Sequence, residues 1–66
     1  MDLVEILTIA IRAEVEAKKL YLKGEAAATT DDARALFRQL ATEEEKHKQL
    51  LLAKYQQLAG KEFTQW

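Results

Sequence analysis

The sequence predicts an all-α protein, an antiparallel two-helix hairpin that dimerises into a four-helix bundle. The 66 residues contain no proline and only two glycines, Gly24 and Gly60, so almost every position is compatible with a helix. Apolar residues recur every three or four positions along two long segments. The one turn-like cluster, "TTDDA" at residues 29–33, lies between them, and such a short turn makes the two helices antiparallel neighbours.

The first helix is expected over about residues 2–27. Asp2 is a candidate N-cap, and Glu5 follows it at the spacing of a capping box. One apolar stripe comprises Leu3, Leu7, Ala10, Ala17 and Tyr21, and a second ridge comprises Val4, Ile11, Val15 and Leu22. A helix with two apolar ridges needs two packing partners, and one neighbouring helix supplies only one of them.

The second helix is expected over about residues 31–59. Thr29, Thr30 or Asp31 can cap its start, and Gly60 suits the position after its end. Its stripe comprises Ala33, Phe37, Leu40, Leu51, Tyr55 and Leu58, widened by Leu36, Leu50 and Leu52. A short tail, residues 60–66, completes the single domain of residues 1–66. The sequence leaves open whether the aromatic residues of this tail, Phe63 and Trp66, pack on a neighbour or fray.

The size of the chain favours a homodimer. A domain this small buries only ~60% of the surface that its unfolded chain exposes, so a lone hairpin has marginal stability. There is no cysteine, which excludes disulfides and thiolate zinc sites. Oligomerisation and a non-thiolate metal remain as sources of stability. Two paired hairpins would cover both apolar ridges, and higher oligomers stay open.

The net charge and the length of the apolar runs exclude two classes of partner. Ten basic and eleven acidic residues give a net charge of −1, which provides no basic field for nucleic acid. No apolar run approaches the ~18–20 residues of a membrane span, so we expect no membrane contact. The N-terminus, "MDLVEILTIA", lacks the basic start of a signal peptide, and a cytoplasmic protein is therefore expected.

Three ionisable residues interrupt the two apolar stripes. Glu14 does so in the first helix, and Glu44 and His47 do so in the second, within "EEEKHK" at residues 43–48. With the turn centred near residue 29, Glu14 and Glu44 lie at equal separations along the chain, which is roughly 22 Å from the turn at ~1.5 Å per residue. His47 lies one helical turn beyond Glu44 on the same face. The hairpin therefore brings the three side chains together.

Carboxylates on a core stripe point to a metal ion. Burying them without a partner costs several kcal/mol each, and no Lys or Arg occupies a stripe position nearby. Carboxylate and imidazole ligands together suit Fe, Mn or Zn better than Ca or Mg. In a homodimer the four carboxylates would balance two divalent ions. The off-stripe charges of the same run, Glu43, Glu45, Lys46 and Lys48, are expected to be solvated surface.

These residues resemble the ferritin-like superfamily, and most closely its rubrerythrin and encapsulated-ferritin branches. The matching motifs are "AEVEAKKLY", with Glu14 and Tyr21, and "LFRQLATEEEKHKQLL", with Glu44 and His47. A Glu from each of two helices and a Glu-x-x-His pair from each of the other two form the ligand set of ferritin-like di-iron proteins. The resemblance implies two Fe ions per dimer, with Glu44 as the bridging carboxylate and Glu14 and His47 as terminal ligands. It also implies that Tyr21 assists by hydrogen bonding to a ligand.

The function implied by the resemblance is oxidation of Fe(II) by O2 or peroxide, as in a ferroxidase. Two alternatives stay open: a rubrerythrin-like peroxide-reducing protein or one that binds Fe, Mn or Zn without turnover, and a helical interaction module without metal. Encapsulated ferritins build their site across a subunit interface, so an encapsulin shell is also a candidate partner. However, "KEFTQW" at residues 61–66 does not resemble a targeting peptide for such a shell.

Overall fold

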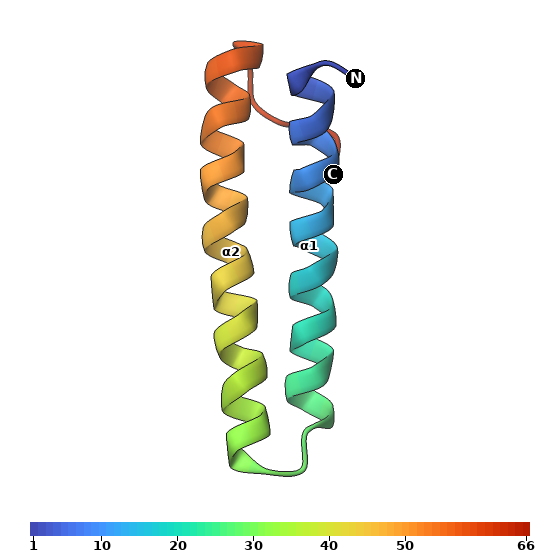
Figure 1. The fold of residues 1–66 in the computed structure, drawn as a ribbon, viewed down its shortest axis with the longest axis vertical. Helices are drawn as coiled ribbons and strands as arrows, with labels where there is room; N and C mark the ends of the chain where they lie inside the picture. Colours follow the sequence, from blue (N-terminus) through green and yellow to red (C-terminus); the bar gives the residue numbers. More distant parts are fainter.

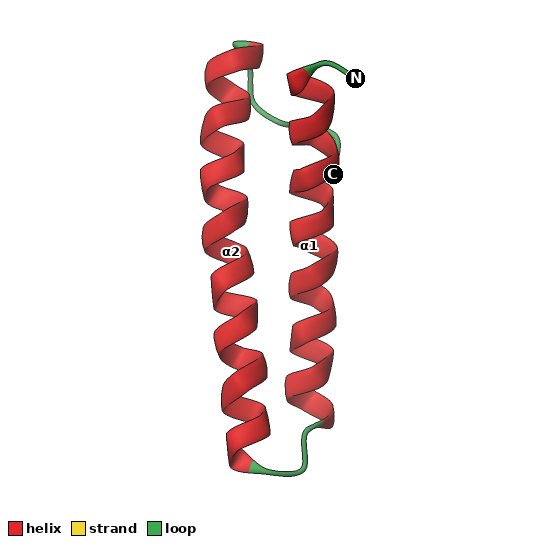
Figure 2. Ribbon diagram, in the orientation of Figure 1, coloured by secondary structure: helices red, strands yellow, loops and turns green.

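The computed structural model describes residues 1–66 as two antiparallel helices and a tail (Figures 1 and 2). Helix α1 spans Leu3–Ala27 and helix α2 spans Asp31–Ala59, and together they form a rod of 44 × 17 × 16 Å. The predicted all-α helical hairpin is confirmed, whereas the pairing of two hairpins into a four-helix bundle stays a prediction. Neither helix carries a segment that is long and apolar enough to cross a membrane.

Local signals set the ends of both helices. The Asp2 carboxylate accepts a hydrogen bond of 2.8 Å from the backbone N–H of Glu5, and the Thr30 hydroxyl accepts one of 3.3 Å from Ala33. Each bond satisfies one of the N–H groups that a helix start leaves without a partner. Helix α2 ends at Gly60, whose φ of 71° lies in the left-handed region that favours glycine.

The main hydrophobic core lies at the end of the hairpin where the chain begins and ends. It consists of Leu7 and Ile11 from α1, Tyr55 from α2 and Phe63 from the tail. The ring of Phe63 packs edge-on against Tyr55 at a centroid distance of 5.1 Å, and Trp66 packs on Phe63 at 4.7 Å. The tail therefore folds back on its own hairpin, crossing from α2 to α1 (Figure 1).

The tail covers only one side of the hairpin. Trp66 lines a surface pocket together with Arg12, Val15 and Lys19 of α1, and it shares a second pocket with Gln49, Leu52 and Gln56 of α2. At 3.6 residues per turn these positions face away from the stripes that contain Glu14, Glu44 and His47. The stripe side of the hairpin is thus left uncovered by the tail.

The burial of the predicted stripes differs from the sequence-based expectation. Two helices in contact bury only a narrow seam, and the seam here is centred on Ile11 and Ala41, slightly around each helix from the stripe. Only five of 66 residues are buried, so this hairpin has a small core for an independent domain. Several residues of the predicted apolar faces are exposed on the single hairpin, and their burial in a dimer stays a prediction: Leu3, Leu22, Leu36, Leu50 and Leu58.

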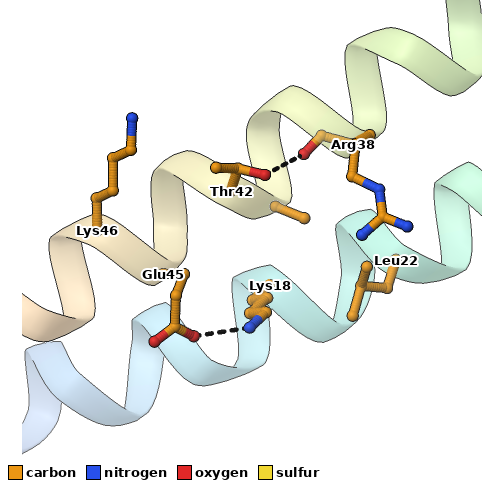
Figure 3. Close-up of a pocket in the computed structure, with 7 residues that line it drawn as sticks. Lys18, Leu22, Arg38, Thr42, Glu45 and Lys46 are labelled. Carbon is orange, nitrogen blue, oxygen red and sulfur yellow. Dashed lines mark hydrogen bonds and ion pairs between the residues drawn. The ribbon is translucent and has the colours of Figure 1, made fainter.

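Two further features lie between the helices towards the turn. Gly24 lies so close to Phe37 that a Cβ atom added at Gly24 would stand 2.7 Å from the Phe37 ring, and this allows the helices to approach each other there. A surface pocket of about 220 Å³ lies beside the contact between Lys18 and Glu45 (Figure 3). Its lining residues are Lys18, Leu22, Arg38, Ala41, Thr42, Glu45 and Lys46.

Candidate metal centre

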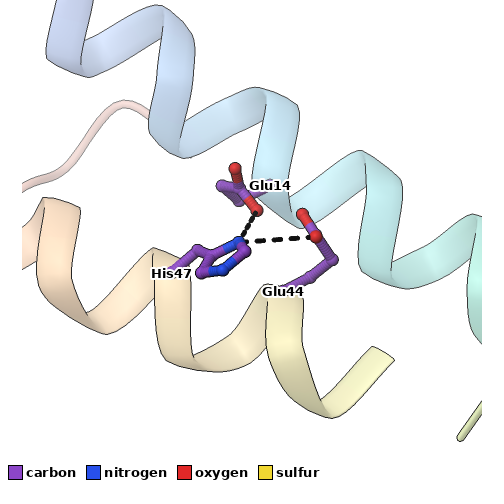
Figure 4. A group of neighbouring side chains, drawn as sticks. All are labelled: Glu14, Glu44 and His47. Atoms are coloured by element: carbon purple, nitrogen blue, oxygen red, sulfur yellow. Dashed lines mark ion pairs between the residues drawn. The ribbon is translucent and has the colours of Figure 1, made fainter. Parts of the chain in front are cut away.

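The structure brings Glu14, Glu44 and His47 together between the two helices (Figure 4). Helix α1 supplies Glu14, and α2 supplies Glu44 and His47 from successive turns of one face. The His47 Nδ1 atom lies 3.6 Å from Glu14 Oε2 and 3.5 Å from Glu44 Oε1. One ligand atom from each residue lies within 4.8 Å of the other two, and no other group of three acidic, His or Cys residues does this.

The two carboxylates are mostly buried, whereas the imidazole is not. The side chains of Glu14 and Glu44 are 22% and 17% exposed, and that of His47 is 53% exposed. Glu14 Oε2 is fully buried and has no hydrogen-bond partner. No Lys or Arg forms an ion pair with Glu14 or Glu44, so His47 is their only neighbour that can become positive. A buried oxygen without a partner is costly in a folded protein, which indicates that a group outside the chain completes this site.

The pKa of Glu14 lies above its usual value of 4.5. The largest cause is the carboxyl of Glu44, because the two groups can hydrogen bond only when one of them holds a proton. Burial and the charge of Glu44 raise this pKa further, and His47 opposes the shift. A cation bound beside Glu14 would take the place of the proton that this carboxyl group holds more tightly than usual.

The donor set fits a transition-metal ion. Ligand atoms at about 2.1 Å from one ion lie roughly 3.0–3.4 Å apart for octahedral to tetrahedral angles. The two distances from His47 Nδ1, 3.5 and 3.6 Å, exceed this range only slightly. Three ligands leave further coordination positions free, so one hairpin supplies only part of a coordination sphere.

A second charged cluster, which the apolar stripes did not predict, lies beside these three residues. Glu45 Oε1 accepts a hydrogen bond of 2.7 Å from Lys18 and forms an ion pair with Lys48 at 3.1 Å, and Gln49 donates a hydrogen bond of 2.8 Å to Glu45 Oε2. These bonds hold the pKa of Glu45 at about 2, with that from Lys18 as the largest cause. The expectation that Glu45 and Lys48 are plain surface residues was therefore wrong, whereas Lys46 is exposed as expected.

Counting residues from the turn places Glu14 opposite Glu44, but it does not place Lys18 opposite Glu45. The reason is that side chains lean towards the N-terminus of their helix. The long side chain of Lys18 leans away from the turn and that of Glu45 leans towards it, so they meet although their Cα atoms lie at different heights. Tyr21 is half-buried and forms no hydrogen bond with any of the three candidate ligands within the hairpin. Its assisting role stays a prediction.

Comparison with known protein families found a match that covers nearly the whole chain. Residues 5–65 match the family model described as Rubrerythrin, which leaves out only the first four residues and the last one. No curated protein and no solved structure is significantly similar to the chain.

Proposed function

The chain belongs to the rubrerythrin family, and on that premise we propose that it is a di-iron carboxylate protein that oxidises Fe(II) with O2 or peroxide. The observation that carries the proposal is the meeting of Glu14, Glu44 and His47 around a buried carboxylate oxygen without a partner. Such a set is the half-site expected from one hairpin of a ferritin-like bundle.

The proposed site is completed by a second copy of the chain. The tail leaves the stripe side of the hairpin uncovered, and large apolar side chains on that side, such as Leu3 and Leu58, are exposed at its end. Two hairpins packed by this side would supply four carboxylates and two imidazoles, enough for two ions. The small intramolecular core gives a further reason for pairing, because a domain of this size usually needs an additional source of stability.

Each side chain has a defined task in this proposal. The carboxylates of Glu14 and Glu44 attract Fe(II), and their burial strengthens this attraction relative to that of exposed acids. They also favour the ferric product, since hard anionic oxygens stabilise the higher charge. Neutral His47 offers the lone pair of a ring nitrogen, so protonation of His47 or of the carboxylates in acid opposes binding. Bound iron supplies the electrons that reduce O2 or peroxide.

A protein that binds metal without turnover is the second candidate. The donor set of two carboxylates and one imidazole suits Mn and Zn as well as Fe, and nothing in the ligand types selects one of them. A peroxide-reducing reaction would use the same residues with a different oxidant.

Anaerobic addition of Fe(II) followed by air tests the proposal. We expect two irons per dimer by titration and, after O2 enters, near-ultraviolet absorption of the ferric product. Binding without oxidation would favour the second candidate. Absence of binding would leave a helical interaction module and would refute the proposal.

Matched variants make the test specific. Glu44→Gln should abolish binding, whereas Glu43→Gln, the same change one residue earlier, should preserve it because Glu43 bonds only to Gln39. His47→Ala should remove the gain in melting temperature that metal gives, and Lys46→Ala should retain it. Equal effects within either pair would contradict the assignment of the ligands.

A further inference from the structure

We propose that Lys18, Glu45 and Lys48 form a positioning network for the metal centre, which holds α1 and α2 in register where Glu14 meets Glu44. The inference rests on the proposed function, because it concerns the same site. It assigns a role to charged residues that bind no metal themselves.

The metal centre needs its two helices to be held in register because its ligands come from both of them. Glu14 moves with α1, and Glu44 and His47 move with α2, so sliding of the helices past each other changes every distance between them. Ligand constellations work only when they are held within about 0.5 Å of the productive geometry.

Apolar packing alone does little to fix the register at this level. The large buried side chains gather at the end of the hairpin that holds Ile11 and Tyr55. Between these positions and the close Gly24–Phe37 contact near the turn, the one fully buried residue is Ala41, whose side chain is too small to interlock with a neighbour. At the level of the ligands, polar contacts across the interface therefore add to the register that the apolar contacts on either side set.

The network supplies these contacts beside the ligands. Lys18 lies one helical turn after Glu14, and Glu45 directly follows Glu44. The 2.7 Å contact between Lys18 Nζ and Glu45 Oε1 crosses from α1 to α2 (Figure 3). A slide of the helices by one residue, about 1.5 Å, would lengthen this contact or force Lys18 and Glu45 into other side-chain conformations. The displacement that would separate Glu14 from Glu44 would therefore also disturb the contact between Lys18 and Glu45.

Other residues hold Glu45 in place. Lys48 forms an ion pair with one of the Glu45 carboxylate oxygens and Gln49 donates a hydrogen bond to the other, which holds the side chain on α2. The ammonium of Lys48 also lies 5.8 Å from the centre of the Trp66 ring, so the tail contacts the network. With both lysines bound to Glu45, neither one pairs with Glu14 or Glu44, and these carboxylates remain free to take a metal ion.

The test compares variants of this pair with a matched ion pair elsewhere. Arg38 and Glu25 form the other Lys or Arg ion pair that joins α1 to α2, at 2.8 Å and nearer the turn. Lys18→Gln and Arg38→Gln remove the same charge from the same interface. The probe is Co²⁺, titrated into the protein of residues 1–66 and followed by its visible absorption bands, which report affinity and ligand geometry together. Thermal melting without metal records stability separately.

We expect Lys18→Gln and Glu45→Gln each to weaken Co²⁺ binding by about tenfold and to alter the absorption bands. The double variant should be no worse than either single one, because both remove the same contact. Arg38→Gln should stay within about twofold of the wild type. Melting without metal should change little in any variant, since partly exposed ion pairs contribute little to stability.

Three results would overturn the inference. Tighter binding by Lys18→Gln together with weaker binding by Glu45→Gln would show that the two residues affect the metal ion only through their charges. Equal weakening by Lys18→Gln and Arg38→Gln would show that any ion pair across the interface matters. Affinity and absorption bands unchanged in Lys18→Gln would show that the register does not depend on the network. In each case the wild type still binds Co²⁺ and the proposed function survives, whereas no binding by the wild type overturns both.

Discussion

Replacement of Glu14 by leucine should stabilise the metal-free protein while it destroys the proposed metal site. Glu14 lies on an apolar stripe, with one carboxylate oxygen fully buried and without a partner. Leucine has a similar volume and no polar atoms, so it can occupy the same space without that penalty. A residue that costs stability until a metal arrives is expected where function, and not folding, has determined the residue type.

The magnitude follows from the burial of the side chain. A buried polar group without a partner costs about 1–3 kcal/mol, and the 22% exposure of Glu14 favours the lower half of that range. We therefore expect a gain of about 1–2 kcal/mol, which for a domain of this size raises the melting temperature by roughly 5–15 °C. Glu16→Leu is the matched control because Glu16 is 72% exposed and pairs only with Lys19. It should change stability by no more than about 0.5 kcal/mol.

Thermal unfolding followed by circular dichroism, with chelator and then with Fe(II) under anaerobic conditions, measures both effects. The pH dependence gives an independent check. The pKa of Glu14 is higher in the folded protein than in the unfolded chain, so the folded form binds more protons and loses stability as pH rises from 4.5 through the raised pKa. Glu14→Leu should lack this loss. If Glu14→Leu melts below Glu16→Leu without metal, the reasoning is refuted.

Three other predictions concern the surroundings of the site. The pKa of Glu45 is lowered to about 2, so the stability that its ionised form gives is complete above pH 4.5 and is lost as pH falls towards 2. Because its side chain is one-third exposed, the loss should be about 1 kcal/mol or less. In acid titrations, Glu45→Gln should not show this loss. Gly24→Ala should destabilise the protein by about 1–2 kcal/mol in urea unfolding, because the new methyl group meets Phe37, whereas helix propensity alone predicts a gain of about 1 kcal/mol. Phe63→Ala should cost about 3 kcal/mol and Trp66→Ala about 1 kcal/mol or less, since Phe63 is buried on Tyr55 and Trp66 is mostly exposed; equal losses would show that the tail does not pack through Phe63.

The hairpin and the meeting of its three polar residues were predictable because local rules govern both. Helix capping by Asp2 and Thr30 and the left-handed Gly60 follow from residue type. The meeting of Glu14 with Glu44 follows from the helical period and from counting residues outwards from the turn. Neither argument requires knowledge of how side chains pack.

The remaining features depend on packing, for which a periodic pattern carries little information. The stripe identified a face of each helix, but the contact between two helices is narrower than the apolar face, so exposed Leu3 and Leu58 could not be told from buried Ile11. The docking of Phe63 depends on a space beside Tyr55 that exists only in the folded hairpin. The Lys18–Glu45 contact depends on the direction of long side chains, which a count of Cα heights ignores.

The arrangement of these features assigns different tasks to the two sides of the hairpin. The tail, with Phe63 and Trp66, closes one side with aromatic packing and contributes Phe63 to the intramolecular core. The other side carries Glu14 and Glu44, whose burial opposes folding of the metal-free chain. A short hairpin can tolerate such a site only if another part of the chain provides stability that does not depend on metal. Removal of the tail should therefore make folding depend on metal and on a partner chain, whereas Glu14→Leu should relieve the requirement for metal.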